Sequence, residues 1–418
     1  MSRDAGLNCE GEDVISASSA YKKILTSVKS FSSEEVSLVD ALHRYLASSM
    51  IAPIDLPVFD HSAMDGYALC HRDVEAASAN LPASLKIVAT LAAGESAKIM
   101  PLERGQAIRI MTGAPIPEGA DAVIPFEKCR TEGSSCVISE PVKAGKHIRR
   151  KGEDVKKGEK VLNEGERITS RKIALLAALG VSGVLVGQKP RVSIISTGNE
   201  LVELGQPLPV GKIYNSNVYA LAAALQEIGI DPKAVGQSLD SAPDLRQALQ
   251  HHLDTDVLIT IGGVSAGDYD LVPRMLVEMG AEIIFHKLAI KPGKPLLFAL
   301  YKGRPIFSLP GNPVSALVVF DRFVRPALLK MMGAGECLRP RRLAQVTEVC
   351  VGSLGKEDYL RATLQYDDGK YWARPAGPQG SAMLKTLADA NGIIFIPETK
   401  DRIAVGESVE VELWEEPS

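Results

Sequence analysis

The chain has 418 residues, and at roughly 100–200 residues per domain this length predicts two to four domains. Hydrophobic residues make up 45% and charged residues 23%, the balance of an ordinary globular protein. The chain has 47 Lys plus Arg and 51 Asp plus Glu, so its net charge is −4. This charge excludes a nucleic-acid binder that works by bulk positive charge, and only a local basic cleft remains possible.

The cysteines and the apolar stretches indicate a cytoplasmic protein. None of the six cysteines falls in a CxxC pair, which argues against a thiol zinc site or a disulfide framework. The N-terminus lacks the basic start and apolar core of a signal peptide. The longest apolar stretch, residues 173–186, contains glycines and is too short to cross a bilayer. We therefore expect neither a membrane nor a nucleic acid as a partner.

The first elements in the chain are predicted to be helices. Ser18 or Ser19 is the expected N-cap of the first helix, and Asp40 is expected to cap a second over residues 41–46. From about residue 53 short alternating runs are broken by Gly and Pro, which predicts a β-rich domain over 53–145.

The stretch that follows is dense in charge and contains a helix over residues 170–179. Neither this stretch nor the first helices can bury a core alone. We therefore predict one discontinuous helical and linker domain, built from residues 1–52 and 146–187.

The second half of the chain is predicted to be α/β and then β. Over residues 188–335 apolar strands alternate with amphipathic helices, which indicates a parallel sheet covered on both faces. Residues 336–418 return to short strands and predict a small, barrel-like β domain. The expected fold is thus a multidomain α/β protein with a central parallel-sheet domain, and ligands should bind beyond the carboxyl ends of its strands.

The loop ITIGGVSAGDYD, residues 259–270, leaves a buried strand and enters a helix. Its glycines allow close backbone approach to a ligand, and the free N–H groups of a helix start attract anions. We favour a phosphate or nucleotide site over the alternative, in which an aspartate merely caps the helix. The absence of GxxxxGK[ST] disfavours a Walker-type NTPase. The candidate ligand-binding residues are Gly262, Gly263, Ser265 and Gly267.

A basic turn and a second strand-to-helix turn follow. Lys287, Lys291 and Lys294 occupy one segment that prolines keep from being helical, and ammonium groups suit phosphate or oxyanion recognition. A solvated basic turn is the alternative. Pro310 and Pro313 flank a turn in which Asn312 is a good N-cap, so this turn is either structural or in contact with substrate.

Three acids follow strands of the same predicted sheet. Glu200, Asp240 and Asp270 lie just past carboxyl ends, near the three lysines. Such a gathering of charge is unfavourable unless ions are bound between them. Magnesium bridging a phosphate-bearing ligand is the simplest explanation.

The β-rich segment carries two further strings, FDHSAMDGYA with Asp65 and RIMTGAPIPEGADAVIP with Thr112. Each is either a turn or part of a site. Arg149 belongs to the string IRRKGED, for which a solvated charge run is the default interpretation.

Taken together, these strings resemble the MoeA family, the molybdopterin molybdotransferases that include the E domain of gephyrin. The resemblance runs from about residue 18 to 412 and rests on FDHSAMDGYA, RIMTGAPIPEGADAVIP, IRRKGED, STGNEL, GGVSAGDYD, KLAIKPGKP, LPGNPVSA and PQGSAMLKTLADANG, in the family's order. It implies that molybdate is inserted into adenylated molybdopterin with magnesium and that AMP is released, the last step of molybdenum cofactor synthesis.

The resemblance also implies roles for individual residues. Asp65, Thr112, Lys287, Lys291 and Asp270 would be catalytic, and Glu200, Asp240 and Asp270 would hold magnesium. The cofactor-binding set would be Gly262, Gly263, Ser265, Gly267, Lys294, Pro310, Pro313, Arg149 and Ser381. Asn199 stands where many relatives carry Asp, so that position is not expected to be an obligatory metal ligand.

By the same resemblance the protein would be a homodimer, with Asp65 and Thr112 across a subunit boundary from the main pocket. A molybdopterin adenylyltransferase would be a transient partner. Two alternatives remain: a molybdopterin-binding scaffold without turnover, and an adenylyltransferase, against which the long β-rich flanks argue.

Overall fold

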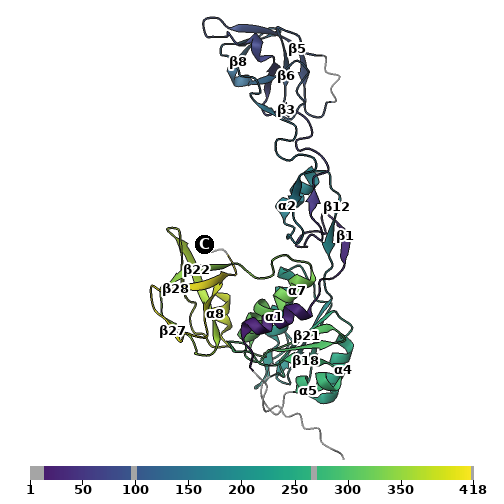
Figure 1. Ribbon diagram of the computed structural model, residues 1–418, viewed down its shortest axis with the longest axis vertical. Helices are drawn as coiled ribbons and strands as arrows, with labels where there is room; N and C mark the ends of the chain where they lie inside the picture. The colour runs from purple at the N-terminus through teal and green to yellow at the C-terminus, as the bar shows by residue number, and fades with distance from the viewer. Residues whose placement is uncertain (1–13, 96–100, 265–270, 416–418) are drawn as a thin grey trace, which may run out of the picture. The chain divides into compact units, whose positions relative to one another are not determined.

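The computed structural model describes residues 14–95, 101–264 and 271–415. The chain divides into two compact units (Figure 1). The first contains the described part of Met1–Ser48, Glu164–Thr169 and the chain from Gly183 onward, and the second contains Ser49–Asn163 and Ser170–Ser182. Among the described residues, no helix has the length and apolar character needed to cross a membrane.

The N-terminal segment differs from the sequence prediction in two places. Helix α1 (Ala17–Ser27) is capped by Ser16, whose side chain accepts a hydrogen bond from the Ser19 amide at 3.2 Å, so the expected cap at Ser18 or Ser19 is wrong. The helix expected over residues 41–46 does not form. There the backbone pairs instead with a later part of the chain, for example from the Leu46 amide to the Glu166 carbonyl at 3.1 Å.

The centre of the first unit is a six-stranded sheet, in the order β16-β13-β17-β21-β20-β18. Four neighbouring strands are parallel: β16 (Ala234–Ser238), β13 (Val192–Thr197), β17 (Val257–Ile261) and β21 (Arg304–Leu309). The prediction of an α/β domain is confirmed, with one addition. Strand β20 (Leu297–Tyr301) is antiparallel to β21 and to the edge strand β18 (Glu282–Phe285). Lys302 and Gly303, both with positive φ, make the two-residue turn of the β20–β21 hairpin.

Helices cover both faces of this sheet, because its strands are apolar on both sides. On one face α4 (Ala242–His252) and α5 (Leu271–Glu278) pack over Leu258. On the other face the core is formed with α1, α3 (Ser216–Glu227), α6 (Pro313–Val319), the π-helical turn η3 (Phe320–Val324) and α7 (Arg325–Met331).

The C-terminal region of the same unit is a small closed barrel, as predicted. Its strands are β24 (Glu357–Asp367), β25 (Lys370–Pro375), β22 (Arg341–Val346), β28 (Ser408–Leu413) and β26 (Gly392–Ile396), and pairing of β24 with β26 closes the ring. Strand β19 (Ile290–Lys291) of the α/β region adds to β24, and the short pair β23 (Cys350–Val351) and β27 (Arg402–Ile403) and helix α8 (Leu384–Ala388) complete the region.

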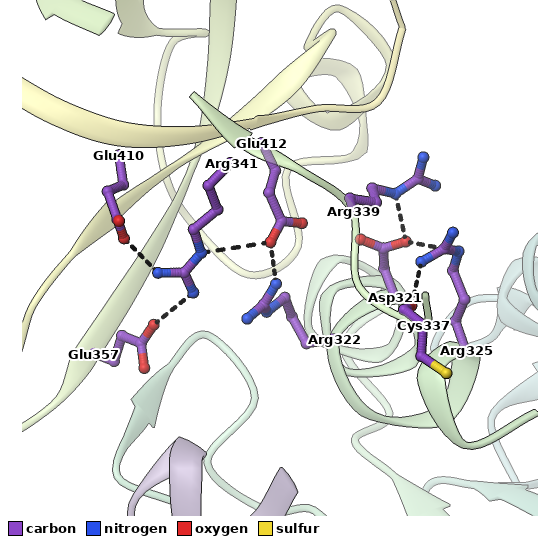
Figure 2. Close-up of polar contacts among 9 residues, drawn as sticks. All are labelled: Asp321, Arg322, Arg325, Cys337, Arg339, Arg341, Glu357, Glu410 and Glu412. Atoms are coloured by element: carbon purple, nitrogen blue, oxygen red, sulfur yellow. Dashed lines mark hydrogen bonds and ion pairs between the residues drawn. The ribbon is translucent and has the colours of Figure 1, made fainter. Parts of the chain in front are cut away.

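A buried charge network joins the barrel to the α/β region (Figure 2). Arg322, on η3, pairs with Glu412 on β28, and their side chains are only 10% and 2% exposed. Arg341 extends the network to Glu410 and lies 3.8 Å from Glu357, and its guanidinium stacks on Phe395 at 4.0 Å. Buried charges are tolerated only when they are paired, so this network fixes the contact between the two regions.

Two antiparallel pairings connect the first 52 residues with residues 146–187. In the first unit β1 (Ser33–Ser37) pairs with β12 (Gly183–Gly187). In the second unit β2 (Met50–Ile51) pairs with β11 (Lys160–Leu162), and helix α2 (Ser170–Ala178) belongs to the same unit.

The rest of the second unit is β-rich. Its six-stranded sheet has the order β7-β4-β6-β5-β9-β8, with β7 (Ala122–Pro125), β4 (Gly66–Leu69), β6 (Gln106–Ile110), β5 (Ala83–Leu91), β9 (Ser135–Ile138) and β8 (Cys129–Glu132). A two-stranded pair, β3 (His61–Ser62) with β10 (Ile148–Arg149), and the 3-10 turns η1 (His71–Asp73) and η2 (Phe126–Lys128) complete it.

Candidate functional site

A pocket of about 730 Å³ lies at the carboxyl edge of the central sheet. Loops that follow β13, β17 and β21 line it, together with the start of α3. This is the edge where parallel sheets bind ligands, and the volume suits a ligand of nucleotide size.

The glycine loop after β17 forms one wall of this pocket. Gly262 and Gly263 line it and have φ values of +89° and +65°. A Cβ at Gly262 would lie 2.7 Å from the Thr197 carbonyl oxygen, so only glycine allows the loop to pass so close to β13. The sequence predicts Ser265, Gly267 and Asp270 for the same loop, and these three lie outside the described residues.

We expect Gly262→Ala to destabilise this wall of the pocket more than Gly280→Ala, which is a matched control. Both glycines have φ near +90°, but nothing lies within 4 Å of a Cβ at Gly280. The control should therefore cost only the backbone strain, about 1–2 kcal/mol, and Gly262→Ala about 1–3 kcal/mol more. Hydrogen exchange of the β17 amides measures the difference. Equal losses of protection would show that the close approach does not constrain the loop.

Two of the predicted metal ligands, Glu200 and Asp240, line this pocket. Two reciprocal hydrogen bonds join Asp240 and Asn199. The backbone N–H of Asn199 donates to Asp240 Oδ2 at 3.2 Å, and the backbone N–H of Asp240 donates to Asn199 Oδ1 at 3.1 Å. The Glu200 carboxylate folds back over Gly198, where a Cβ would be 2.7 Å from its oxygens. Asn199 thus fixes the loop that carries the two acids.

The turn after β21 forms the opposite wall. Pro310, Gly311, Asn312 and Pro313 line the pocket, and Pro313 is the first residue of α6, as predicted. The side chain of Asn312 makes no capping hydrogen bond to the start of α6, so its amide group is not used in capping that helix. Ser381, of the C-terminal region, reaches the same place, because its carbonyl accepts from the Val314 amide at 3.3 Å.

The three lysines lie in a closed turn beside this pocket and are not among its described lining residues. The Leu288 amide donates to the Lys294 carbonyl at 2.9 Å and closes the turn, and Pro295, the next residue, lines the pocket. The Lys287 carbonyl accepts from the Ile15 amide at 3.1 Å. Lys291 lies on β19, where that strand joins the barrel.

In the second unit the structure brings Asp65 and Thr112 together. Asp65 Oδ1 accepts hydrogen bonds from the backbone amide and from the hydroxyl of Thr112, both at 2.7 Å. These bonds, the one from the backbone first, hold the pKa of the Asp65 carboxyl below its ordinary value, so it is ionised at neutral pH. Arg149 lies on β10, opposite His61 on β3.

The sequence reasoning missed the two asparagines at the start of α3, which line the pocket. Asn217 donates to the Gly311 carbonyl at 2.6 Å, and the buried Asn215 donates to Ser196 at 2.8 Å. They are placed by the short parallel pair β14 (Leu201–Val202) and β15 (Ile213–Tyr214). The string YNSN, just before a strong helix pattern, was the available signal.

The described residues also bring Cys70, His71 and Asp121 close enough to consider a metal, with one ligand atom of each within 4.8 Å of the others. However, Asp121 already accepts from the His71 amide at 2.6 Å and contacts His71 Nδ1 at 2.5 Å. These are the contacts of a carboxylate that caps the start of η1, so we assign no metal to this trio.

Three family sequence models match the chain in order. That of the MoeA N-terminal region (domain I and II) matches residues 15–180, that of a probable molybdopterin binding domain matches 193–330, and that of the MoeA C-terminal region (domain IV) matches 352–414.

Similar curated proteins and solved structures span nearly the whole chain. Molybdopterin molybdenumtransferase 2 of Mycobacterium tuberculosis is 40% identical over 90% of this chain and 94% of its own length. The molybdopterin molybdenumtransferase of Synechococcus elongatus is 37% identical over 95% and 99%. A crystal structure of the molybdopterin biosynthesis MoeA protein of Pyrococcus horikoshii is 34% identical, covers 96% of this chain and 100% of its own, and has a TM-score of 0.78.

Proposed function

This chain belongs to the MoeA family, and on that premise we propose that it inserts molybdate into adenylated molybdopterin and releases AMP. It is a transferase, as are the molybdopterin molybdenumtransferases to which it is 33–40% identical over most of its length. The observation that carries the proposal is the pocket at the sheet edge, which is lined by glycines, asparagines and the acids Glu200 and Asp240.

The pocket offers distinct groups to the parts of such a substrate. The close-packed Gly262–Gly263 turn can take the pyrophosphate against its backbone. Asn217 and Asn312 present amide groups suited to the polar edges of a pterin or a nucleobase. Molybdate is an oxyanion, for which Lys287 and Lys291 are the proposed partners. An oxygen of water or of molybdate attacks a phosphorus of the pyrophosphate, the bridging P–O bond breaks and AMP leaves. The two dithiolene sulfurs replace oxygens of molybdate, which leave as water with the thiol protons.

The acids of this pocket fit magnesium. Mg²⁺ prefers carboxylate oxygens together with substrate phosphates. Asp240 is tied to Asn199 through Oδ2, and no described residue is bonded to Oδ1, while the Glu200 carboxylate lies over Gly198 in the same pocket. We propose that Glu200, Asp240 and Asp270 hold the ion, which would neutralise charge on the pyrophosphate.

We expect Glu200→Gln to raise the magnesium concentration needed for half-maximal molybdate-dependent AMP release by about 10- to 100-fold, because the site loses a charged oxygen ligand. The assay uses adenylated molybdopterin with the full chain. Glu203→Gln is the matched control, since Glu203 lies in the same loop and does not line the pocket. An unchanged magnesium requirement in Glu200→Gln would contradict this ligand, and no AMP release by the unaltered protein would contradict the proposed function.

The assembly and the location are proposals of the same kind. We propose a homodimer in which Asp65 and Thr112 of one chain act at the sheet-edge pocket of the other, in the cytoplasm. A molybdopterin adenylyltransferase is the proposed transient partner, because the adenylated substrate has to be supplied by such a reaction.

A further inference from the structure

A fully buried carboxylate lies where the basic turn meets the C-terminal barrel. Strand β19 pairs in parallel with β24, with Lys291 opposite Asp358, and the Glu357 amide donates to the Ala289 carbonyl at 2.9 Å. The Asp358 side chain is 0% exposed, and neither of its carboxylate oxygens has a well-formed hydrogen bond among the described residues, although the backbone N–H and the hydroxyl of Ser353 approach it. Burial raises the pKa of this carboxyl, and Lys291 and then the backbone and hydroxyl groups of Ser353 oppose that rise. A buried carboxylate without a well-formed hydrogen bond is costly, so a cation beside it stabilises the barrel.

Lys291 supplies that cation. Its ammonium lies 3.8 Å from Asp358 Oδ1 and donates to the Ser353 hydroxyl at 3.3 Å. The Lys291 side chain is nevertheless 59% exposed, so its remaining N–H groups stay open to a ligand.

The turn that carries Lys291 is fixed on the pocket side as well. A Cβ at Gly293 would collide with Val319 of α6, so the turn packs directly against the helix that starts at the pocket wall. Pro295, two residues further on, lines the pocket. Barrel residues thus contact the Lys291 side chain, and the turn that carries Lys291 packs against α6 of the α/β region.

We propose that Asp358, assisted by Ser353, is a positioning residue that fixes the Lys291 ammonium for binding the oxyanion substrate. This inference rests on the proposed function. It gives the C-terminal barrel a part in the reaction, because an acid of the barrel sets the direction of a lysine side chain from the basic turn. A lysine side chain loses conformational entropy when it is fixed in one orientation. Because Asp358 fixes Lys291 in the free protein, binding of the oxyanion does not have to include this entropy loss.

The test compares Asp358→Asn, Ser353→Ala and the control Asp367→Asn, an exposed carboxylate at the end of the same strand. We expect Asp358→Asn to raise the molybdate concentration for half-maximal AMP release about tenfold, Ser353→Ala to raise it by a few fold, and Asp367→Asn to leave it unchanged. A second readout does not need turnover: the lysine Cε resonance of Lys291, labelled with ¹³C and assigned through Lys291→Arg, should move in Asp358→Asn and not in the control.

A double-mutant cycle separates positioning from a purely structural effect. If Asp358 acts through Lys291, Asp358→Asn should change the molybdate response little in a Lys291→Met background. An equal loss in both backgrounds would overturn the proposal, as would an unmoved Lys291 resonance. A moved resonance in a protein that never releases AMP would leave the contact in place and contradict the proposed function instead.

Discussion

Replacing Asp65 by asparagine is expected to lower molybdate-dependent AMP release by about 100- to 1,000-fold, the usual effect of removing one electrostatic group from a reaction site. The change keeps the size of the side chain and removes its charge. Thr112 holds the carboxylate ionised through two hydrogen bonds of 2.7 Å, so asparagine loses a negative charge that the wild type carries at neutral pH. Because Asp65 is exposed, we expect no change in the midpoint of thermal unfolding.

Thr112→Ser is the matched control, because it keeps both donors to Asp65 and should keep most of the activity. Full activity in Asp65→Asn would contradict the catalytic role of this residue.

The same variant tests the proposed homodimer. At a magnesium concentration that is sufficient for the wild type but not for Glu200→Gln, Asp65→Asn and Glu200→Gln are each expected to be poorly active, and they alter different units of the chain. If each site combines the two units from different chains, unfolding and refolding an equal mixture should restore about a quarter of wild-type activity, because half of the dimers are mixed and each has one intact site. If each site is built within one chain, mixing should restore nothing.

Replacing Arg322 by methionine is expected to destabilise the C-terminal barrel by about 3–5 kcal/mol, since it leaves a buried charge without its partner. Glu412 is 2% exposed, and among the described residues its remaining ion-pair partner would be Arg341, whose Nε lies 3.8 Å away. Burial raises the pKa of Glu412, and Arg322 opposes that rise. Both tryptophans, Trp372 and Trp414, belong to the C-terminal region, so their fluorescence follows its unfolding in urea.

The double variant Arg322→Met/Glu412→Leu is the control for this effect. When both charges are replaced by apolar groups of similar size, the penalty should largely disappear, because no unpaired charge remains buried. If the double variant is as unstable as Arg322→Met, the network of Figure 2 stabilises by packing and not by the pairing of charges.

Much of the fold could be predicted because hydrophobic periodicity determines it. The apolar strands β13, β17 and β21 and their helices gave the central sheet, and the alternating strands after residue 338 gave the barrel. The failures occurred where local signals compete. Asp40 looked like a helix cap, but tertiary pairing of the following residues with Glu166 and its neighbours prevailed over local propensity.

The site could be predicted in part, because strand ends in a parallel sheet meet at one edge whatever the details of the loops. That rule places Gly262, Glu200 and Asp240 around one pocket. It could not pair Asp65 with Thr112, 47 positions apart, or Lys291 with Asp358, because such contacts depend on strand register between distant segments. Asp358 carries no motif, and only its burial identifies it.

On the proposed function, the sheet-edge pocket couples molybdate insertion to the release of AMP. The most direct measurement incubates the full chain with adenylated molybdopterin and magnesium, adds molybdate, and follows AMP and protein-bound molybdenum in the same samples. We predict that AMP appears only after molybdate is added, with one molybdenum retained in the cofactor for each AMP released. AMP release that is absent, or that proceeds equally well without molybdate, would contradict the account.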